Sequence, residues 1–173
     1  MRHTLSVLVE NEFGVLARIA GMFSARGYNI ESLTVAETLD PTVSRMTIIT
    51  RGSDQIIEQI TKQLHRLVNV LKVVDVTEEG DHITREMVLI KVTADGDARA
   101  EVLRLVEIFR GRVVDVSPRT LTVEVTGTED KIKAIIDLMM PLGIKEVARS
   151  GQVAMARGAK TLGGERKPAR TEG

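Results

Sequence analysis

Residues 4–37 read TLSVLVENEFGVLARIAGMFSARGYNIESLTVAE, and this stretch decides the fold. In residues 5–9 the side chains at every second position are leucine or valine, which predicts a strand. Apolar residues then recur at helical spacing from residue 16 to residue 23, and Gly27 suits the end of that helix. Residues 30–37 return to a strand pattern, so the stretch predicts a strand, a helix and a second strand in that order.

The rest of the chain completes this pattern and repeats it. The elements expected to complete the first unit are a strand at residues 44–50, a helix begun by Ser53 or Asp54 that buries Ile56, Ile60, Leu64 and Leu67, and a strand at residues 70–76. The expected second unit has a strand around Val88, Ile90 and Val92, a helix with Val102, Leu105, Val106 and Phe109 on its apolar face, a hairpin of residues 113–116 and 121–125, a helix begun by Thr128 and ended by Pro141 and Gly143, and a strand at residues 144–148.

This double pattern predicts an α+β fold of two tandem ferredoxin-like βαββαβ domains, each with two helices on one face of its sheet. The predicted domains are residues 1–78 and 84–158, joined by a polar linker at residues 79–83 and followed by a polar tail at residues 159–173 that we expect to be disordered. Several strands carry neighbouring apolar residues, such as the isoleucine pair at 48–49, and a sheet that is apolar on both faces usually buries both. We therefore expect the open face or an edge strand to pair with a second copy of the chain.

Composition excludes several classes of function. Lys and Arg number 24, as do Asp and Glu, whereas a nucleic-acid-binding protein usually carries a basic surplus. RNA-recognition domains share the βαββαβ order, but they stack bases on aromatic residues, which make up only 2% of this chain. The absence of cysteine excludes disulfides, iron–sulfur ligation and thiolate zinc sites, and it fits a reducing compartment. We therefore expect no nucleic-acid partner.

The remaining polar residues have plain structural interpretations. His3, His65 and His82 lie far apart without ligand spacing, so we expect surface residues and no metal site. The acidic residues between 75 and 81 fit a solvated linker, and arginines such as Arg149 fit a solvated surface. No nucleophile with a neighbouring base, glycine-rich phosphate loop or paired-carboxylate motif is present. We therefore predict no catalytic residues and no enzyme activity for this chain alone.

Hydropathy gives an expectation about location. No apolar run approaches the ~20 residues that a membrane-spanning helix needs. No charged-then-apolar leader precedes the first strand pattern. We therefore expect no membrane partner and a cytoplasmic location.

A candidate ligand site lies where the first strand meets the first helix, at residues 11–16 (NEFGVL). The first backbone N–H groups of a helix lack internal partners and can bind a carboxylate, and glycine lets a ligand approach that backbone. The amide groups of Asn11 and of Asn29, which opens the second strand, can accept hydrogen bonds from an ammonium group or donate them. Taken locally, Asn11 also fits a helix cap and Asn29 a turn, because asparagine is common in both roles.

Two levels of family resemblance favour the ligand site. The first strand, the loop at residues 11–16, the helix at 17–26 and residues 27–33 together resemble an ACT domain, a small ligand-sensing module attached to amino-acid metabolism. About residues 4–158 resemble the regulatory small subunits of acetolactate synthase, also called acetohydroxyacid synthase. The segments that carry the longer resemblance are Gly27–Val35, DPTVSRMT at 40–47, QLHRLV at 63–68, EIFRG at 107–111 and VARSG at 147–151.

The resemblance implies a regulatory function. In that family the catalytic large subunit uses thiamine diphosphate, magnesium and FAD to condense pyruvate into acetolactate, and the small subunit binds none of them. The resemblance further implies a homodimer through the ACT domains, the large subunit as a partner, and valine or another branched-chain amino acid as a feedback effector. The effector-binding residues that it implies, with the loop of one chain facing the second strand of its partner, are Asn11, Gly14, Val15, Leu16, Asn29 and Ile30. Phe13 departs from the family pattern, because many ACT loops have proline there.

Two other classes of function compete with this interpretation. The chain could be a stand-alone ACT-type regulator that binds an amino acid and controls a different enzyme, in which case a different partner would co-purify with it. An independent enzyme would turn over pyruvate as the pure chain, and we expect no such turnover.

Overall fold

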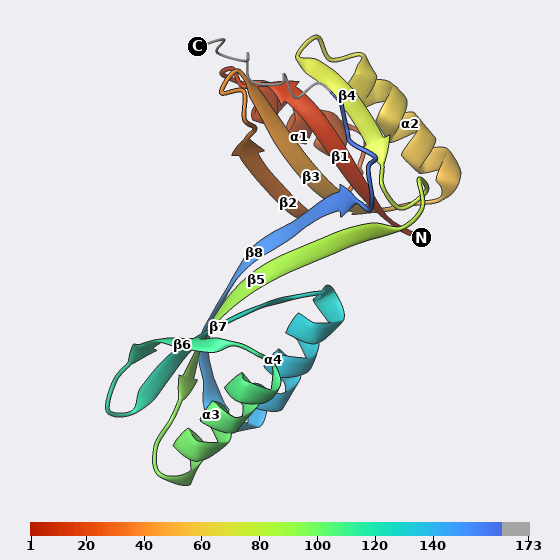
Figure 1. The fold of residues 1–173 in the computed structure, drawn as a ribbon. Helices are drawn as coiled ribbons and strands as arrows, with labels where there is room; N and C mark the ends of the chain where they lie inside the picture. Colours follow the sequence, from red (N-terminus) through yellow and green to blue (C-terminus); the bar gives the residue numbers. More distant parts are fainter. Residues whose placement is uncertain (164–173) are drawn as a thin grey trace, which may run out of the picture. The chain divides into compact units, whose positions relative to one another are not determined.

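A computed structural model describes residues 1–163 of the chain, and it contains the βαββαβ order twice (Figure 1). The first six elements are β1 (Arg2–Glu10), α1 (Val15–Ala25), β2 (Ile30–Glu37), β3 (Val43–Arg51), α2 (Asp54–His65) and β4 (Val70–Asp75). The other six are β5 (His82–Thr93), α3 (Asp97–Ile108), β6 (Arg112–Val116), β7 (Thr120–Gly127), α4 (Glu129–Gly143) and β8 (Ile144–Ala156). The predicted α+β class and the tandem ferredoxin-like order are confirmed.

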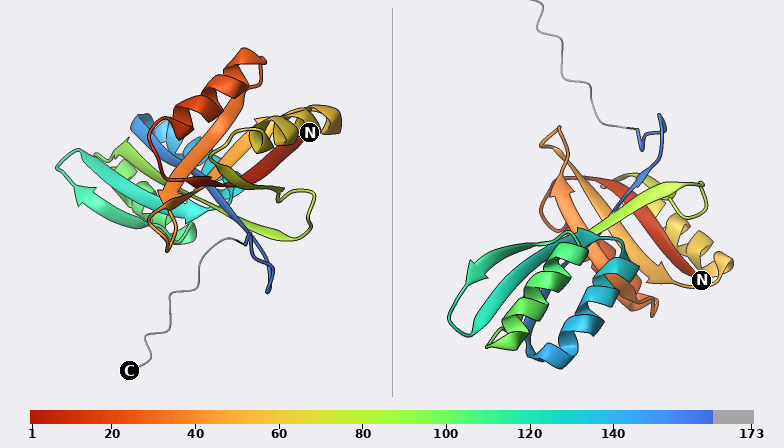
Figure 2. Two further views of the ribbon diagram at one scale, coloured as in Figure 1. Left: turned by 90° about the horizontal axis from the view of Figure 1, so that it is seen from above. Right: turned by 60° about the horizontal axis from the view of Figure 1, so that its bottom comes forward.

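The chain divides into two compact units. The first contains Met1–Ile83 together with the described residues from Ala154 on, and the second is Thr84–Val153. The two four-stranded sheets have the orders β2-β3-β1-β4 and β6-β7-β5-β8. In each unit the two helices lie on one face of the sheet (Figures 1 and 2).

One core per unit fills the space between sheet and helices. In the first unit, Leu5, Val7 and Val9 of β1 point toward the helices and pack with buried residues of both. The buried helix residues of this core are Val15, Ile19, Met22 and Phe23 of α1 and Ile57, Ile60 and Leu64 of α2. In the second unit, Val88, Ile90 and Val92 of β5 hold the equivalent positions. Burial of this kind contributes roughly 25 cal/mol per Å² of apolar surface, so these two cores provide the main driving force for folding.

One helix prediction needs correction, and another is confirmed. Ile56 was expected in the core, but it is 37% exposed and Ile57 is the buried residue. The helix begins at Asp54 with the Ser53 side chain as its cap, and this phase turns residues 57, 60 and 64 inward. The helix that was expected to end at Pro141 and Gly143 ends at Gly143, and Pro141 lies in its last turn. Proline is tolerated there because it removes only one hydrogen bond, in the last turn of the helix.

The C-terminal boundary also differs from expectation. The last strand was predicted at residues 144–148, but β8 extends to Ala156 beside the long strand β5. Its residues from Ala154 on belong to the first unit, so the second unit ends before residue 158. Of the tail expected at 159–173, residues 159–163 are described and the others lie outside the described residues.

The face of the first sheet that the helices leave open is already buried. Ser6 and Leu8 of β1 are 0% and 1% exposed, and Ile49 of β3 is 0% exposed. These side chains alternate with the helix-facing ones, so they point to the other face. Part of their cover comes from the chain itself, since the Arg45 guanidinium donates to the Ala154 carbonyl at 2.7 Å. A second copy is therefore not needed to cover the centre of this face, and the sheet edges are the positions left for pairing.

Candidate functional site

The start of α1 presents uncapped backbone N–H groups. Gly14 is the N-cap residue with φ 80°, a left-handed conformation that favours glycine, and no side chain caps this helix end. The first turn carries no acidic residue either. The N–H groups of the first turn and the positive end of the helix dipole therefore face outward and can bind a carboxylate.

Asn11 does not cap this helix. Its amide nitrogen donates to the Glu37 carboxylate at 3.0 Å and to the Pro41 carbonyl at 2.9 Å. These two bonds orient the amide so that its oxygen, which has no hydrogen-bond partner among residues 1–163, remains an acceptor. Asn11 therefore suits a ligand ammonium group and not a ligand carboxylate.

Asn29 and Ile30 lie at the start of β2, which is an edge strand of the first sheet. The Asn29 backbone carbonyl accepts from the Thr50 hydroxyl at 2.6 Å, and this bond fixes the backbone. The Asn29 side chain is exposed, and it makes no hydrogen bond to any of the described residues. Its amide is available to a ligand or to another chain.

The predicted residues form two separate groups within one chain. Asn11 and Gly14–Leu16 lie at the beginning of α1, while Asn29 and Ile30 follow its end. A helix of 11 residues is about 16 Å long at 1.5 Å per residue. One amino acid cannot bridge this length, so one chain does not assemble all six residues into one pocket.

The exposure of each side chain decides which residues of the α1 loop can contact a ligand. Val15 is 4% exposed and belongs to the core, so only its backbone can reach a ligand. Leu16 is 45% exposed, and the Phe13 side chain is fully exposed at 104%. A shallow depression is lined by Asn11, Glu12 and Phe13. Apolar contacts to a ligand at this loop can therefore come from Leu16 and Phe13.

Glu37 is a neighbour of the candidate site that the sequence did not predict. Its carboxylate holds the Asn11 amide, and it lies at the end of β2. Nothing in the spacing of residues 11 and 37 marks this contact, because β3 and the turn at Pro41 bring the loop and the strand end together. The carboxylate adds an anion beside the predicted position of an ammonium group.

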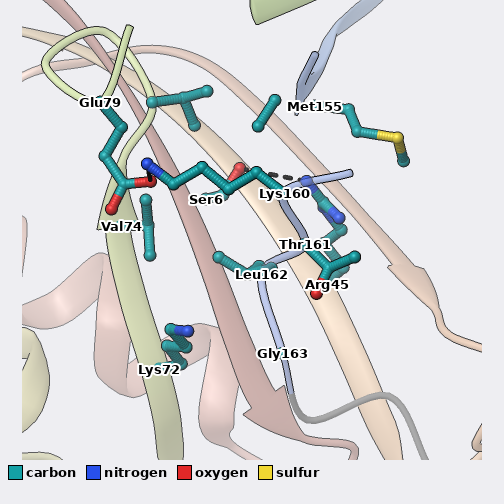
Figure 3. Close-up of a pocket in the computed structure, with 12 residues that line it drawn as sticks. Ser6, Arg45, Lys72, Val74, Glu79, Met155, Lys160, Thr161, Leu162 and Gly163 are labelled. Atoms are coloured by element: carbon teal, nitrogen blue, oxygen red, sulfur yellow. Dashed lines mark hydrogen bonds and ion pairs between the residues drawn. The ribbon is translucent and has the colours of Figure 1, made fainter. Parts of the chain in front are cut away.

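A partly open pocket of about 460 Å³ lies elsewhere in the first unit, between the sheet face that the helices leave open and the C-terminal segment (Figure 3). Ser6, Arg45 and Val74 line it from the sheet. Lys160, from the expected tail, reaches across it to the Glu79 carboxylate at 2.7 Å. This part of the tail therefore packs on the sheet, contrary to the expected disorder.

Arg149 is exposed, as its sequence suggested, but it pairs with a buried carboxylate. Its guanidinium donates two hydrogen bonds to the Glu86 carboxylate, at 2.6 and 2.8 Å. The Glu86 side chain is 2% exposed. The hydrogen bond with Glu86 raises the pKa of Arg149 against an opposing effect of burial. The pair joins β5 to β8 within the second unit.

A cluster of charges fixes the start of β2. Glu31 receives hydrogen bonds from Arg2 of β1, at 2.8 Å, and from Arg51 of β3. Desolvation alone would raise the pKa of Glu31, but the two arginines outweigh it and lower this pKa below its ordinary value of 4.5. The cluster orders the strand end that carries Asn29.

Substituting Glu31→Gln is expected to reduce the loss of stability in acid. Because the folded-state pKa is lowered, the stabilisation is present above pH 4.5 and disappears as the pH falls through the folded-state pKa. Exposed ion pairs contribute about 1 kcal/mol or less, so the variant loses about that amount at pH 7 and little at pH 3. Urea unfolding at both pH values measures the difference, with Glu12→Gln as the control. Equal losses at both pH values would contradict the assignment.

Among residues 1–163, none of the helices combines the length and the apolar character that a membrane-spanning helix requires.

Comparisons with known proteins cover nearly the whole chain. Residues 5–72 match the model of the AHAS small subunit-like ACT domain, and residues 85–158 match that of the small subunit of acetolactate synthase. The acetolactate synthase small subunit of Aquifex aeolicus is 58% identical over 157 residues, which are 90% of this chain and 81% of that protein. The acetolactate synthase isozyme 3 small subunit of Salmonella typhimurium is 53% identical over 163 residues, which are 94% of this chain and 99% of that protein. The crystal structure of the Thermotoga maritima small subunit superposes with a TM-score of 0.84 at 43% identity, and the match covers 91% of this chain and 98% of that one.

Proposed function

The chain belongs to the family of acetolactate synthase small subunits, and from this membership we propose that it activates a separate catalytic subunit and makes that subunit sensitive to valine or another branched-chain amino acid. Thiamine diphosphate, magnesium and FAD are then cofactors of the catalytic subunit. This chain contributes the site that binds the effector. It also contributes the surface through which effector binding changes the activity of the catalytic subunit.

The observation that carries the proposed site is the Asn11–Glu37 hydrogen bond. It ties the α1 loop to the end of β2, whereas Asn29 stands at the start of β2. In a twofold dimer joined through the β2 edges, the two strands run antiparallel. If the axis passes between the two copies of Leu33, position 29 of one chain lies opposite Glu37 of the other. Asn29 of one protomer then approaches Asn11 of its partner.

This dimer interface between two β2 edges, called the seam below, also accounts for exposed apolar residues around β2 and around the loop before α1. Val35 is 43% exposed on the edge strand, and Phe13 and Leu16 are exposed beside it. Large apolar side chains gathered at a sheet edge favour association with another chain. The proposed homodimer would bury them around the effector.

Each part of an amino acid finds a partner in this seam. The carboxylate binds the N–H groups at the start of α1, and the ammonium group binds the Asn11 amide oxygen and the Glu37 carboxylate. Asn29 of the partner chain orients the polar end, and Leu16 and Ile30 contact the aliphatic side chain. A ligand this small reaches roughly −8 to −4 kcal/mol, or micromolar to millimolar affinity.

Reconstitution with the catalytic subunit tests the function. Acetolactate formation should rise when the chain is added and fall again with valine, leucine or isoleucine. A coupling free energy of ~1–3 kcal/mol corresponds to an effect of about 5- to 150-fold. Unchanged rates, or co-purification with an enzyme that does not use thiamine diphosphate, would favour the stand-alone regulator instead. Pyruvate turnover by the pure chain would identify an independent enzyme.

Valine is expected to strengthen the dimer. A ligand that binds across a seam binds only the associated state, so it shifts the equilibrium by mass action. At a valine concentration of about 100 times its dissociation constant, each site adds about 2.7 kcal/mol. Sedimentation across a range of chain concentrations measures the shift, with D-valine as the control. An unchanged dimer dissociation constant at saturating valine would place the effector within one protomer.

A further inference from the structure

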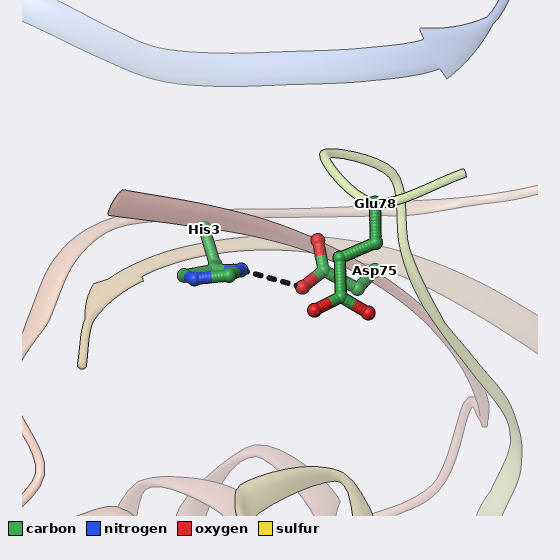
Figure 4. Close-up of side chains that lie close together, drawn as sticks. All are labelled: His3, Asp75 and Glu78. Atoms are coloured by element: carbon green, nitrogen blue, oxygen red, sulfur yellow. Dashed lines mark hydrogen bonds and ion pairs between the residues drawn. The ribbon is translucent and has the colours of Figure 1, made fainter. Parts of the chain in front are cut away.

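A buried histidine lies among carboxylates at one end of the first sheet. His3 of β1 is 1% exposed, although its sequence predicted a surface residue. Its Nδ1 atom lies 2.7 Å from Asp75 Oδ2, at the end of β4 (Figure 4). Its Nε2 atom is buried without a hydrogen-bond partner among the described residues, and the nearest carboxylate oxygen, Asp54 Oδ1, is 3.8 Å away.

Neither tautomer of a neutral His3 fits this surrounding. If Nδ1 carries the proton, it donates to Asp75, and the Nε2 lone pair faces the Asp54 carboxylate. If Nε2 carries the proton, the Nδ1 lone pair meets the Asp75 oxygen at 2.7 Å. In the second case two acceptors meet between side chains that are only 2% and 9% exposed. In the first case Nε2 has no hydrogen-bond donor among the described residues, and the Asp54 side chain that it faces is 77% exposed.

Carboxylates lie on more than one side of the His3 ring. The Glu78 carboxylate lies beside Asp75 (Figure 4), and Asp54 is a third carboxylate near the ring. Lys62 lines the adjacent groove between α2 and β4, and its ammonium group pairs with Glu58 at 2.6 Å. A divalent cation would offset part of the negative charge around His3.

We propose that His3, Asp75 and Glu78 bind a divalent transition-metal cation of the zinc type. One ligand atom from each side chain can be chosen so that all three lie within 4.8 Å of one another. An ion bound at about 2.1 Å from each atom fits among them once the exposed Glu78 side chain turns inward. An imidazole nitrogen favours zinc or cobalt over magnesium.

Metal binding would give the Nε2 atom of His3, which lacks a hydrogen-bond partner among the described residues, a role as a donor. When Nδ1 binds the metal, Nε2 carries the proton and points at Asp54. Metal-binding histidines usually donate their second N–H group to a carboxylate, which fixes the ring and its tautomer. Asp54 opens α2, so the site would join β1, β4 and the first turn of α2.

Metal titration of the full chain tests the site. The chain is prepared without a histidine tag and treated with a chelator, and Zn²⁺ is then added in a calorimeter. Binding of one ion per chain is expected, and Co²⁺ should develop the visible absorption of a coordinated ion. The melting temperature should rise with Zn²⁺ concentration. Absence of saturable binding up to millimolar Zn²⁺, with a protonated His3 ring seen by NMR, would overturn the proposal.

Variants locate the ion. Glu78→Gln replaces an exposed side chain, so the fold should be retained while Zn²⁺ affinity falls at least tenfold. Its matched control is Glu79→Gln, whose carboxylate pairs with Lys160 and which should change affinity less than threefold. His3→Gln should abolish binding, and His82→Gln should not. Retained affinity in both Glu78→Gln and His3→Gln would rule out this site.

Discussion

Replacing Asn29 with alanine is expected to weaken valine binding by about tenfold or more and to remove the corresponding part of the feedback inhibition. The side chain is exposed and makes no hydrogen bond to residues 1–163, so the substitution costs the fold little. A hydrogen bond to a charged group contributes about 1.5–3 kcal/mol, which sets the size of the loss. Calorimetry with valine measures it directly. Gln55→Ala removes an exposed amide from α2 and is the matched control.

A mixing experiment tests whether each site uses two chains. Chains with Asn11→Ala and chains with Asn29→Ala should each bind valine weakly as homodimers. In a mixed dimer, one seam site keeps Asn11 from one chain and Asn29 from the other, so one intact site per dimer is expected. Recovery of high-affinity binding on mixing would support the shared site. No recovery in proven heterodimers would refute it.

Replacing Arg149 with alanine is expected to destabilise the second unit by about 3 kcal/mol or more. The substitution leaves the Glu86 carboxylate, 2% exposed, without its two hydrogen bonds. Breaking one side of a buried pair costs ~3–5 kcal/mol, because a buried charge remains uncompensated. Urea unfolding of the full chain, followed by circular dichroism, measures the loss.

Two further variants separate this effect from the loss of any arginine. Arg112→Ala disrupts an exposed pair with Glu124, at 3.5 Å, and should cost less than about 1 kcal/mol. Adding Glu86→Gln to Arg149→Ala should restore part of the stability, since the buried group is then neutral. If both single arginine variants lose equal stability, Glu86 is not a buried charge that depends on Arg149.

The local pattern of the sequence was sufficient for most of the fold. Residues 30–37 were predicted as a strand, and β2 has those bounds. Ser53 and Thr128 were predicted as helix caps, and both side chains accept from the third helical N–H group. Errors arose where the phase of a helix or the length of a strand depends on contacts with another element, as for Ile56 and for β8.

The candidate site was only partly predictable. The glycine at the start of α1 and the amide of Asn11 could be identified from the strand–loop–helix pattern. The roles of Glu37, of the buried Val15 side chain and of His3 could not, because each depends on a contact or on burial that residue spacing does not encode.

The sequence by itself determined the two βαββαβ units, the absence of cysteine chemistry and the position of the α1 loop, because periodicity, composition and local backbone preferences act over a few residues. Only the tertiary structure decided which polar groups are already paired. It engages the Asn11 nitrogen with Glu37 and leaves Asn29 at a sheet edge. It also places His3 against Asp75 and Arg149 against Glu86, each more than 60 residues away. The physical reason is that the burial of a side chain and its polar contacts depend on which distant strands become neighbours. The order and register of the strands fix these neighbours for the whole sheet together.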